Sequence, residues 1–152
     1  MINKKDLQII AHLRQDARMP LTTMSRKTNI PVSTIFDRLK ANESSLIVKH
    51  TCLLDFNKLG YSVRANITFR VERDDKEKLK EFLLKNASVN SLYKINNGFD
   101  YLVECIFKQI KDMDSFMDDV ENKFRIIDKQ SFFIIEDLKK EEFMANPEMI
   151  FE

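Results

Sequence analysis

Hydrophobic positions in the first fifty residues recur every three to four residues, which is the spacing of short amphipathic helices. Asn3 is placed to cap a first helix that ends near residues 15–16, with Asp6 as its capping-box partner. A second helix follows Pro20, and residues 32–41 predict a third, with Asn29 between them in a left-handed conformation. The residues expected to face inward are Leu7, Ile10, Leu13, Ala17, Leu21, Met24, Ser25, Ile35 and Leu39. Three short helices with a tight turn before the third form the helix-turn-helix arrangement.

After residue 46 the pattern changes to strands and longer helices. Residues 47–56 predict a linking strand that leads into a turn at residues 57–60. Residues 63–71 alternate strictly between apolar and polar side chains, which is typical of a strand with one buried face. Further on, the pattern predicts a helix starting at Asp74 or Asp75 and ending near Asn86, strands at 89–95 and 101–107, a helix at 112–124 and a strand at 126–136. This β-α-β-β-α-β order is that of a ferredoxin-like domain.

The predicted fold class is therefore α+β, with a winged-type helix-turn-helix followed by the ferredoxin-like domain. We expect a helix-turn-helix domain at residues 1–50, a linking strand and hinge at 51–61, the ferredoxin-like domain at 62–137 and a tail at 138–152. Such a sheet carries helices on one face only. Because the later strands have apolar residues on both sides, we expect a partner subunit to cover the other face; these residues are Leu102, Ile106, Phe133 and Ile135. The tail predicts a short packed helix and an arm.

Composition limits the classes of function that are open to this chain. The chain has 152 residues and a formal net charge of +1, with no apolar run long enough to span a membrane, and we expect it in the cytoplasm. Only two glycines occur, which excludes glycine-rich phosphate loops. Two cysteines and two histidines leave little for a disulfide framework, a metal site or histidine catalysis. We expect no metal, no cofactor and no enzyme activity, with Cys52 and Cys105 as buried small apolar residues and His12 as an exposed helix residue. The Asp74–Asp75 pair is expected to be solvated or to complement a helix dipole.

Charge is distributed unevenly along the chain. Residues 1–50 carry a net charge of +5, whereas residues 51–152 carry −4. A basic helix-turn-helix points to a polyanion, and double-stranded DNA is the expected partner. Hydroxyl and basic side chains around the second and third helices would contact phosphates or bases, and Asp37 would read a cytosine or orient Arg38. The candidate DNA-binding residues are Thr22, Thr23, Arg26, Lys27, Ser33, Thr34, Asp37, Arg38, Lys40 and Lys49.

Four segments in this order resemble the Lrp/AsnC (leucine-responsive, feast/famine) transcriptional regulators. Residues 5–18 resemble the family's opening "D-x-x-I-L…D-A-R", and residues 31–39 resemble its recognition helix. Residues 54–60 (Leu-Asp-Phe-Asn-Lys-Leu-Gly) resemble its hinge, and residues 97–102 (Asn-Gly-Phe-Asp-Tyr-Leu) its effector loop. The likeness extends from residue 4 to about residue 136.

The resemblance implies a sequence-specific regulator that dimerises through its C-terminal (RAM-type) sheets and, in many members, builds tetramers or octamers. It also implies an amino acid or another small effector between dimers. Carried over by position, the effector-loop residues are Asn96, Asn97, Gly98, Phe99 and Asp100. The family commonly has Thr-Gly-Asp at the first three of these positions, and an ordinary hairpin turn is an equal alternative for this loop.

Two other functions share this architecture. Siroheme decarboxylases would use histidine and arginine around a tetrapyrrole, but both histidines here, His12 and His50, lie at or before residue 50. In a scaffold protein, the first fifty residues would only brace an oligomer. Salt-dependent, sequence-selective DNA binding distinguishes the regulator from both alternatives.

Overall fold

The computed structural model describes residues 1–151, which divide into two compact units. The first unit comprises Met1–Leu53 together with the segment from Leu138 onward, and the second comprises Leu54–Asp137. Each unit has its own hydrophobic cluster. The C-terminal tail therefore groups with the N-terminal helices, although the sheet lies between them in the sequence.

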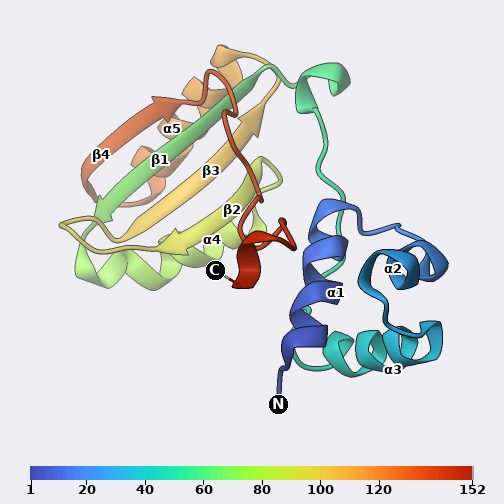
Figure 1. Ribbon diagram of the computed structural model, residues 1–152. Coiled ribbons are helices and arrows are strands. Elements are labelled where there is room, and N and C mark those ends of the chain that lie inside the picture. Colours follow the sequence, from blue (N-terminus) through green and yellow to red (C-terminus); the bar gives the residue numbers. More distant parts are fainter. Residues whose placement is uncertain (152) are drawn as a thin grey trace. The chain divides into compact units, whose positions relative to one another are not determined.

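The first unit contains the three predicted helices, α1 (Lys4–Gln15), α2 (Leu21–Thr28) and α3 (Val32–Glu43) (Figure 1). The capping box that starts α1 is formed: the Asn3 side chain accepts from the Asp6 backbone, and the Asp6 carboxylate accepts from the Asn3 backbone. Asn29 lies between α2 and α3 with a φ of 56°, as predicted. These local signals were sufficient to define all three helices.

Packing within the first unit differs from the predicted inward positions of α1. The core cluster consists of Ile9, Met24, Ile30 and Ile35, with Leu13, Met19, Leu21 and Leu39 packed against it. Leu7 and Ile10 are only half-buried and Ala17 is exposed. His12, expected on the surface, is buried, and this burial, followed by the nearby Lys27 charge, lowers its pKa. Helical spacing in α1 is compatible with more than one inward stripe, and the packing selects the one containing Ile9.

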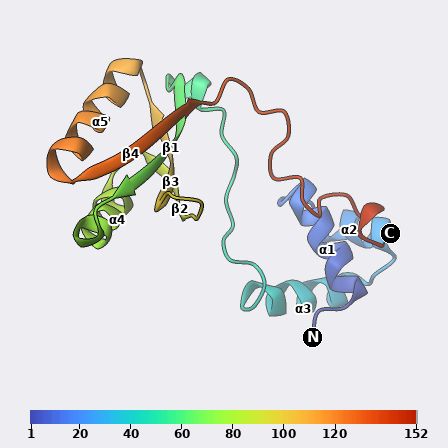
Figure 2. The same cartoon turned by 90° about the vertical axis from the view of Figure 1, so that its left-hand side faces the viewer.

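The C-terminal tail packs beside α1 (Figure 2). The Arg14 guanidinium donates to the backbone carbonyls of Phe143 and Glu141 at 2.7 and 2.9 Å and forms an ion pair with the Glu141 carboxylate at 3.2 Å. Ala145 is buried. The expected tail helix is present only as a 3-10 turn at Met149–Phe151, while the Phe143 side chain is exposed.

The linking strand predicted at residues 47–56 is wrong for this single chain. Residues 47–55 have no regular secondary structure, and a short 3-10 helix follows at Phe56–Leu59. An extended segment becomes a strand only when a neighbour supplies hydrogen bonds, and no strand of the described chain pairs with it. Cys52, expected to be buried, is exposed here, and the exposed His50 lies 3.5 Å from Glu43.

The second unit has the predicted β-α-β-β-α-β order. Its elements are β1 (Val63–Val71), α4 (Lys76–Lys85), β2 (Val89–Lys94), β3 (Tyr101–Phe107), α5 (Ile110–Lys123) and β4 (Ile126–Phe133). The strands form one antiparallel sheet in the order β2-β3-β1-β4 (Figure 1). The ferredoxin-like arrangement is thus confirmed, although β4 ends three residues before the predicted boundary.

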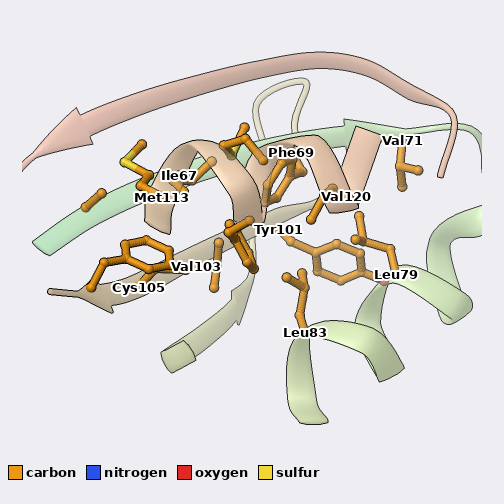
Figure 3. Packing of buried hydrophobic residues seen from close by; sticks show 14 of the residues in the cluster. Ile67, Phe69, Val71, Leu79, Leu83, Tyr101, Val103, Cys105, Met113 and Val120 are labelled. Carbon is orange, nitrogen blue, oxygen red and sulfur yellow. The ribbon is translucent and has the colours of Figure 1, made fainter. Parts of the chain in front are cut away.

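Both long helices of this unit cover the same face of the sheet (Figure 2). Alternate residues of β1 and β3 point into the core beneath them, where Phe69 and Val103 meet Leu79 and Leu83 of α4 and Val120 of α5 (Figure 3). Cys105 belongs to this cluster, and burial raises the pKa of its thiol to about 12. At neutral pH it is therefore a protonated, apolar core residue, as expected.

Asp75 connects the start of α4 to the start of β4. The backbone N–H and the Nε of Arg125 donate to one Asp75 carboxylate oxygen at 2.9 and 3.3 Å. These hydrogen bonds, the backbone one first, lower the pKa of Asp75. Of the two roles expected for the Asp74–Asp75 pair, solvation is wrong for Asp75, which is buried where α4 begins, and correct for Asp74.

Replacing Asp75 with Asn should make the unfolding free energy depend less steeply on pH in the acid range. Because folding lowers this pKa, its stabilising contribution is present above the usual aspartate value of 3.8 and is lost as pH falls below it. The unfolding free energy of the wild-type protein should therefore fall more steeply in acid than that of Asp75→Asn, as measured by urea unfolding at a series of pH values. Asp74→Asn is the matched control, and an acid limb equally steep in all three proteins would contradict the assignment.

Candidate nucleic-acid interface and ligand cavity

Helix α3 presents two faces of different character. Ile35 and Asn42 are buried and Leu39 packs against the core of the unit. The opposite stripe has the spacing i, i+3, i+4 and i+7, which places its members side by side on a helix. All four are exposed: Ser33, Phe36, Asp37 and Lys40. This stripe could enter a groove of a nucleic acid, because its polar groups are available to a ligand.

Arg38 does not belong to that stripe. Its guanidinium lies 3.4 Å from a carboxylate oxygen of Asp6, and the Asn42 side-chain amide donates to the other oxygen at 3.3 Å. Asp6 itself is only 2% exposed. The sequence placed Arg38 on the outer face with Asp37 as its neighbour, but the structure engages it in a polar cluster between α1 and α3. Asp6, Arg38 and Asn42 therefore hold the recognition helix in place.

Helix α2 contributes a second group of polar side chains. Thr22, Arg26 and Lys27 are exposed, and Arg26 donates to the hydroxyl of the half-buried Thr23 at 3.4 Å. Thr34 is half-buried at the start of α3, and Lys49 is exposed in the linking segment. The helix-turn-helix thus brings most of the predicted DNA-binding residues onto α2 and α3, where the first helix of such a motif contacts the backbone and the second the bases.

Phe36 was missed by the sequence analysis, which assigned no role to it. The available signal was its position, three residues after Ser33 and four before Lys40, in a helix whose inward residues were already identified.

A shallow cavity of about 320 Å³ lies in the second unit between α4 and β2. Four of its charged side chains are already paired with one another: Lys76 lies 3.1 Å from Asp100, and Lys80 lies 2.7 Å from Glu77. The Tyr101 hydroxyl donates to the Lys76 carbonyl at 3.0 Å, and burial raises the pKa of this phenol. The complete lining is Lys76, Glu77, Lys80, Leu84, Leu92, Lys94, Ile95, Asp100 and Tyr101. It combines apolar walls with charges of both signs.

Only one of the five predicted effector-loop residues lines this cavity. Asp100 does so while its carboxylate also accepts from the Val71 backbone N–H at 2.9 Å. Asn96, Asn97 and Gly98 are exposed and Phe99 is half-buried, and Asn97 and Gly98 adopt φ values of 64° and 85°. Consecutive left-handed residues are typical of a tight hairpin turn. The residues of α4 that line the cavity were missed because they are far from the loop in sequence.

Among residues 1–151, no group of three or more His, Cys, Asp or Glu side chains is arranged to hold a metal ion. No helix in that part of the chain is sufficiently long and apolar to cross a bilayer.

Comparison with known protein families agrees with both units. The Lrp/AsnC ligand binding domain matches residues 64–143, and a winged helix-turn-helix DNA-binding domain matches residues 2–41. The transcriptional regulator FL11 of Pyrococcus horikoshii is 30% identical over 118 residues, which cover 77% of this chain and 78% of FL11. An uncharacterized HTH-type transcriptional regulator of Pyrococcus abyssi is 25% identical over 97% of this chain and its own full length.

Solved structures show the same fold. A transcriptional regulator of Neisseria meningitidis in complex with L-Met superimposes with a TM-score of 0.84 at 21% identity, covering 92% of this chain and 94% of that one. The matched ligand-binding domain spans more than half of the chain and follows the DNA-binding domain in the expected order. The chain is therefore a member of the Lrp/AsnC family of DNA-binding transcriptional regulators.

Proposed function

We propose that the protein acts as a symmetric dimer or larger assembly that places two copies of α3 in successive major grooves of its operator. The observation that carries this proposal is the exposed stripe of α3, flanked by Thr22, Arg26 and Lys27 of α2. In this arrangement half-sites lie about 34 Å apart or at a multiple of that distance. Lys40 and Lys49 supply further phosphate contacts, and Ser33, Thr34 and Asp37 reach base edges or phosphates.

The sheet of the second unit supports dimerisation. Its helix-free face carries apolar side chains on β2, β3 and β4, while β1, which lies between β3 and β4, contributes the polar Asn66 and Thr68. Tyr93 pairs with Leu102, and Asn66 pairs with Phe132; Tyr93 and Phe132 are both exposed in the single chain. A second copy packed on this face would remove apolar area from water, which is the main driving force of association.

The cavity between α4 and β2 supports an effector-binding role. It combines Leu84, Leu92 and Ile95 with amino and carboxylate groups, a combination that suits a small zwitterion such as an amino acid. Asp100 connects the cavity to the hairpin and to β1 through its bond with Val71. The protein from Neisseria meningitidis was solved with L-Met, which supports the same class of ligand here. Effector binding would then change operator affinity through a linkage between two sites.

A single titration series tests this function. Fluorescence anisotropy follows the full-length protein binding to the DNA upstream of its own coding region, at two salt concentrations, with scrambled DNA as control. A parallel series contains a mixture of the twenty amino acids. Selective binding that weakens steeply with salt supports the regulator, and a shift with the amino acids supports the effector site. Equal affinity for operator and scrambled DNA would overturn sequence-specific binding.

Arg26→Ala should weaken binding to operator and scrambled DNA by a similar factor. If Arg26 contacts a phosphate, its loss lowers the slope of log K against log salt by about one unit per contact and leaves base preference unchanged. Lys111→Ala removes one positive charge from an exposed position on α5 and is the matched control, with an unchanged slope expected. Identical slopes for Arg26→Ala and the wild type would remove Arg26 from the interface.

A further inference from the structure

The exposed stripe of α3 contains an apolar side chain at its centre. Phe36 is 55% exposed, and Val32, one turn earlier on the same side of the helix, is 40% exposed. Neither residue belongs to the core cluster of the first unit or packs against it. The remaining members of the stripe, Ser33, Asp37 and Lys40, are polar or charged. The fold therefore leaves an aromatic ring and the neighbouring Val32 in water beside polar and charged side chains.

The chemistry of the major groove gives this ring a specific partner. Most groups on base edges are hydrogen-bond donors or acceptors, but thymine alone presents a methyl group there, and phenylalanine is one of the side chains that contact it. Phe36 lies in the first half of α3, the part of a recognition helix that reaches base edges. Arg38, the arginine of α3, is held by Asp6. The aromatic ring is thus well placed to read sequence where the arginine is not.

We propose that Phe36 determines specificity by packing against the thymine methyl group at one or two positions of each operator half-site, with Val32 extending the apolar contact. This inference rests on the proposed function, because it requires α3 to enter the major groove. It assigns the apolar contact to Phe36 and leaves the neighbouring polar positions to Ser33 and Asp37. Exposure of the ring in the free protein is the consequence, because its apolar partner is present only in the complex.

The test uses duplexes selected by the wild-type full-length protein from a library with a randomised centre. In the selected operator, each thymine is replaced singly by deoxyuridine, which removes the C5 methyl group and keeps the base-pairing edge. At the thymine read by Phe36 the wild-type protein should bind roughly four-fold more weakly per half-site, as expected for losing about one buried methyl-sized contact. Phe36→Ala should bind the thymine and deoxyuridine duplexes equally at that position.

Two further variants separate a base contact from a general loss of binding. Lys40→Ala, from the same exposed stripe, should bind all duplexes more weakly and keep the wild-type sensitivity to deoxyuridine, because it removes a charge and no apolar contact. Phe36→Leu retains apolar volume and should keep part of that sensitivity. Thermal unfolding of each variant confirms that the helix-turn-helix is intact, and because Phe36 lies outside the core cluster we expect melting temperatures close to the wild type.

The outcomes distinguish this inference from the proposed function. If the wild-type protein selects an operator and Phe36→Ala selects the same thymines with the same sensitivity to deoxyuridine, the assignment of Phe36 is overturned while the regulator stands. If the wild-type protein selects no sequence at all, both fall. A Phe36→Ala variant that changes the size of the assembly in light scattering, with an unchanged thymine preference, would also overturn the assignment and place the ring between subunits.

Discussion

The Leu83→Ala variant should lose about 2–5 kcal/mol of the unfolding free energy of the second unit. Leu83 is 0% exposed and lies on α4 among the core residues contributed by β1, β3 and α5 (Figure 3). Truncation removes the transfer free energy of the side chain and leaves a cavity, and the two effects add. Because the protein has two units, a single global transition is not assumed. Amide hydrogen exchange of β1 and β3 measures the stability of this unit directly.

The neighbouring leucine provides the control for this experiment. Leu84 has the same side chain on the same helix but is 65% exposed. We expect Leu84→Ala to change the same exchange free energy by less than about 0.5 kcal/mol. A similar loss in both variants would indicate that α4 responds to helix propensity and not to the packing of Leu83. A loss in neither would contradict the position of the core.

Asp6→Ala should lower the unfolding free energy of the helix-turn-helix by about 2–3 kcal/mol, since it leaves buried and partly buried donors without an acceptor. The carboxylate accepts from the Asn3 backbone at 2.8 Å, from Asn42 at 3.3 Å and from Arg38 at 3.4 Å. Arg38 is partly exposed, so solvent screens its ion pair with Asp6. The loss of unfolding free energy therefore stays below that of a fully buried pair. Operator binding should weaken as well, because α3 loses its attachment to α1.

Amide exchange of α1, α2 and α3 measures this loss, with Lys5→Ala as the control. Lys5 is the preceding residue of α1 and is exposed, so its replacement should leave exchange nearly unchanged. Arg38→Ala adds a second comparison. If Arg38 acts through Asp6, its loss should destabilise α3 and weaken binding to all sequences, without changing base preference. Loss of one base preference at full stability would instead show that Arg38 leaves Asp6 to contact DNA.

Local patterns were sufficient for most of the fold. The capping box at Asn3, the left-handed Asn29 and the strict alternation of residues 63–71 each involve neighbours in sequence, and each is present in the structure. The prediction of a linking strand failed because strand formation depends on a hydrogen-bonding neighbour that the local pattern does not contain. The prediction that His12 is exposed failed for a similar reason. The burial of His12 depends on how the helices pack, and the Lys27 charge that also lowers its pKa comes from another helix.

In the candidate sites, too, neighbouring residues specified some features and packing between distant segments decided others. Sequence placed the basic and hydroxyl residues on α2 and α3, because helical spacing and turn residues fix those helices. It could not show that Asp6 draws Arg38 away from the exposed stripe, since the two residues lie 32 positions apart. The sequence predicted an effector loop at residues 96–100, and of these only Asp100 lines the cavity between α4 and β2, whose other lining residues are distant in sequence. Contacts between distant segments are decided by packing.

The sequence alone therefore determined the order and type of the elements, the two-part architecture and the family resemblance, because each depends on spacing between near neighbours. The tertiary structure decided which face of each helix is buried, which charged groups are engaged and which remain available. Side-chain availability depends on what packs against it, and for Asp6 and Asp75 the hydrogen-bond donors Arg38, Asn42 and Arg125 come from other segments of the chain. The exposed ring of Phe36 became visible for the same reason, once the buried face of α3 was known.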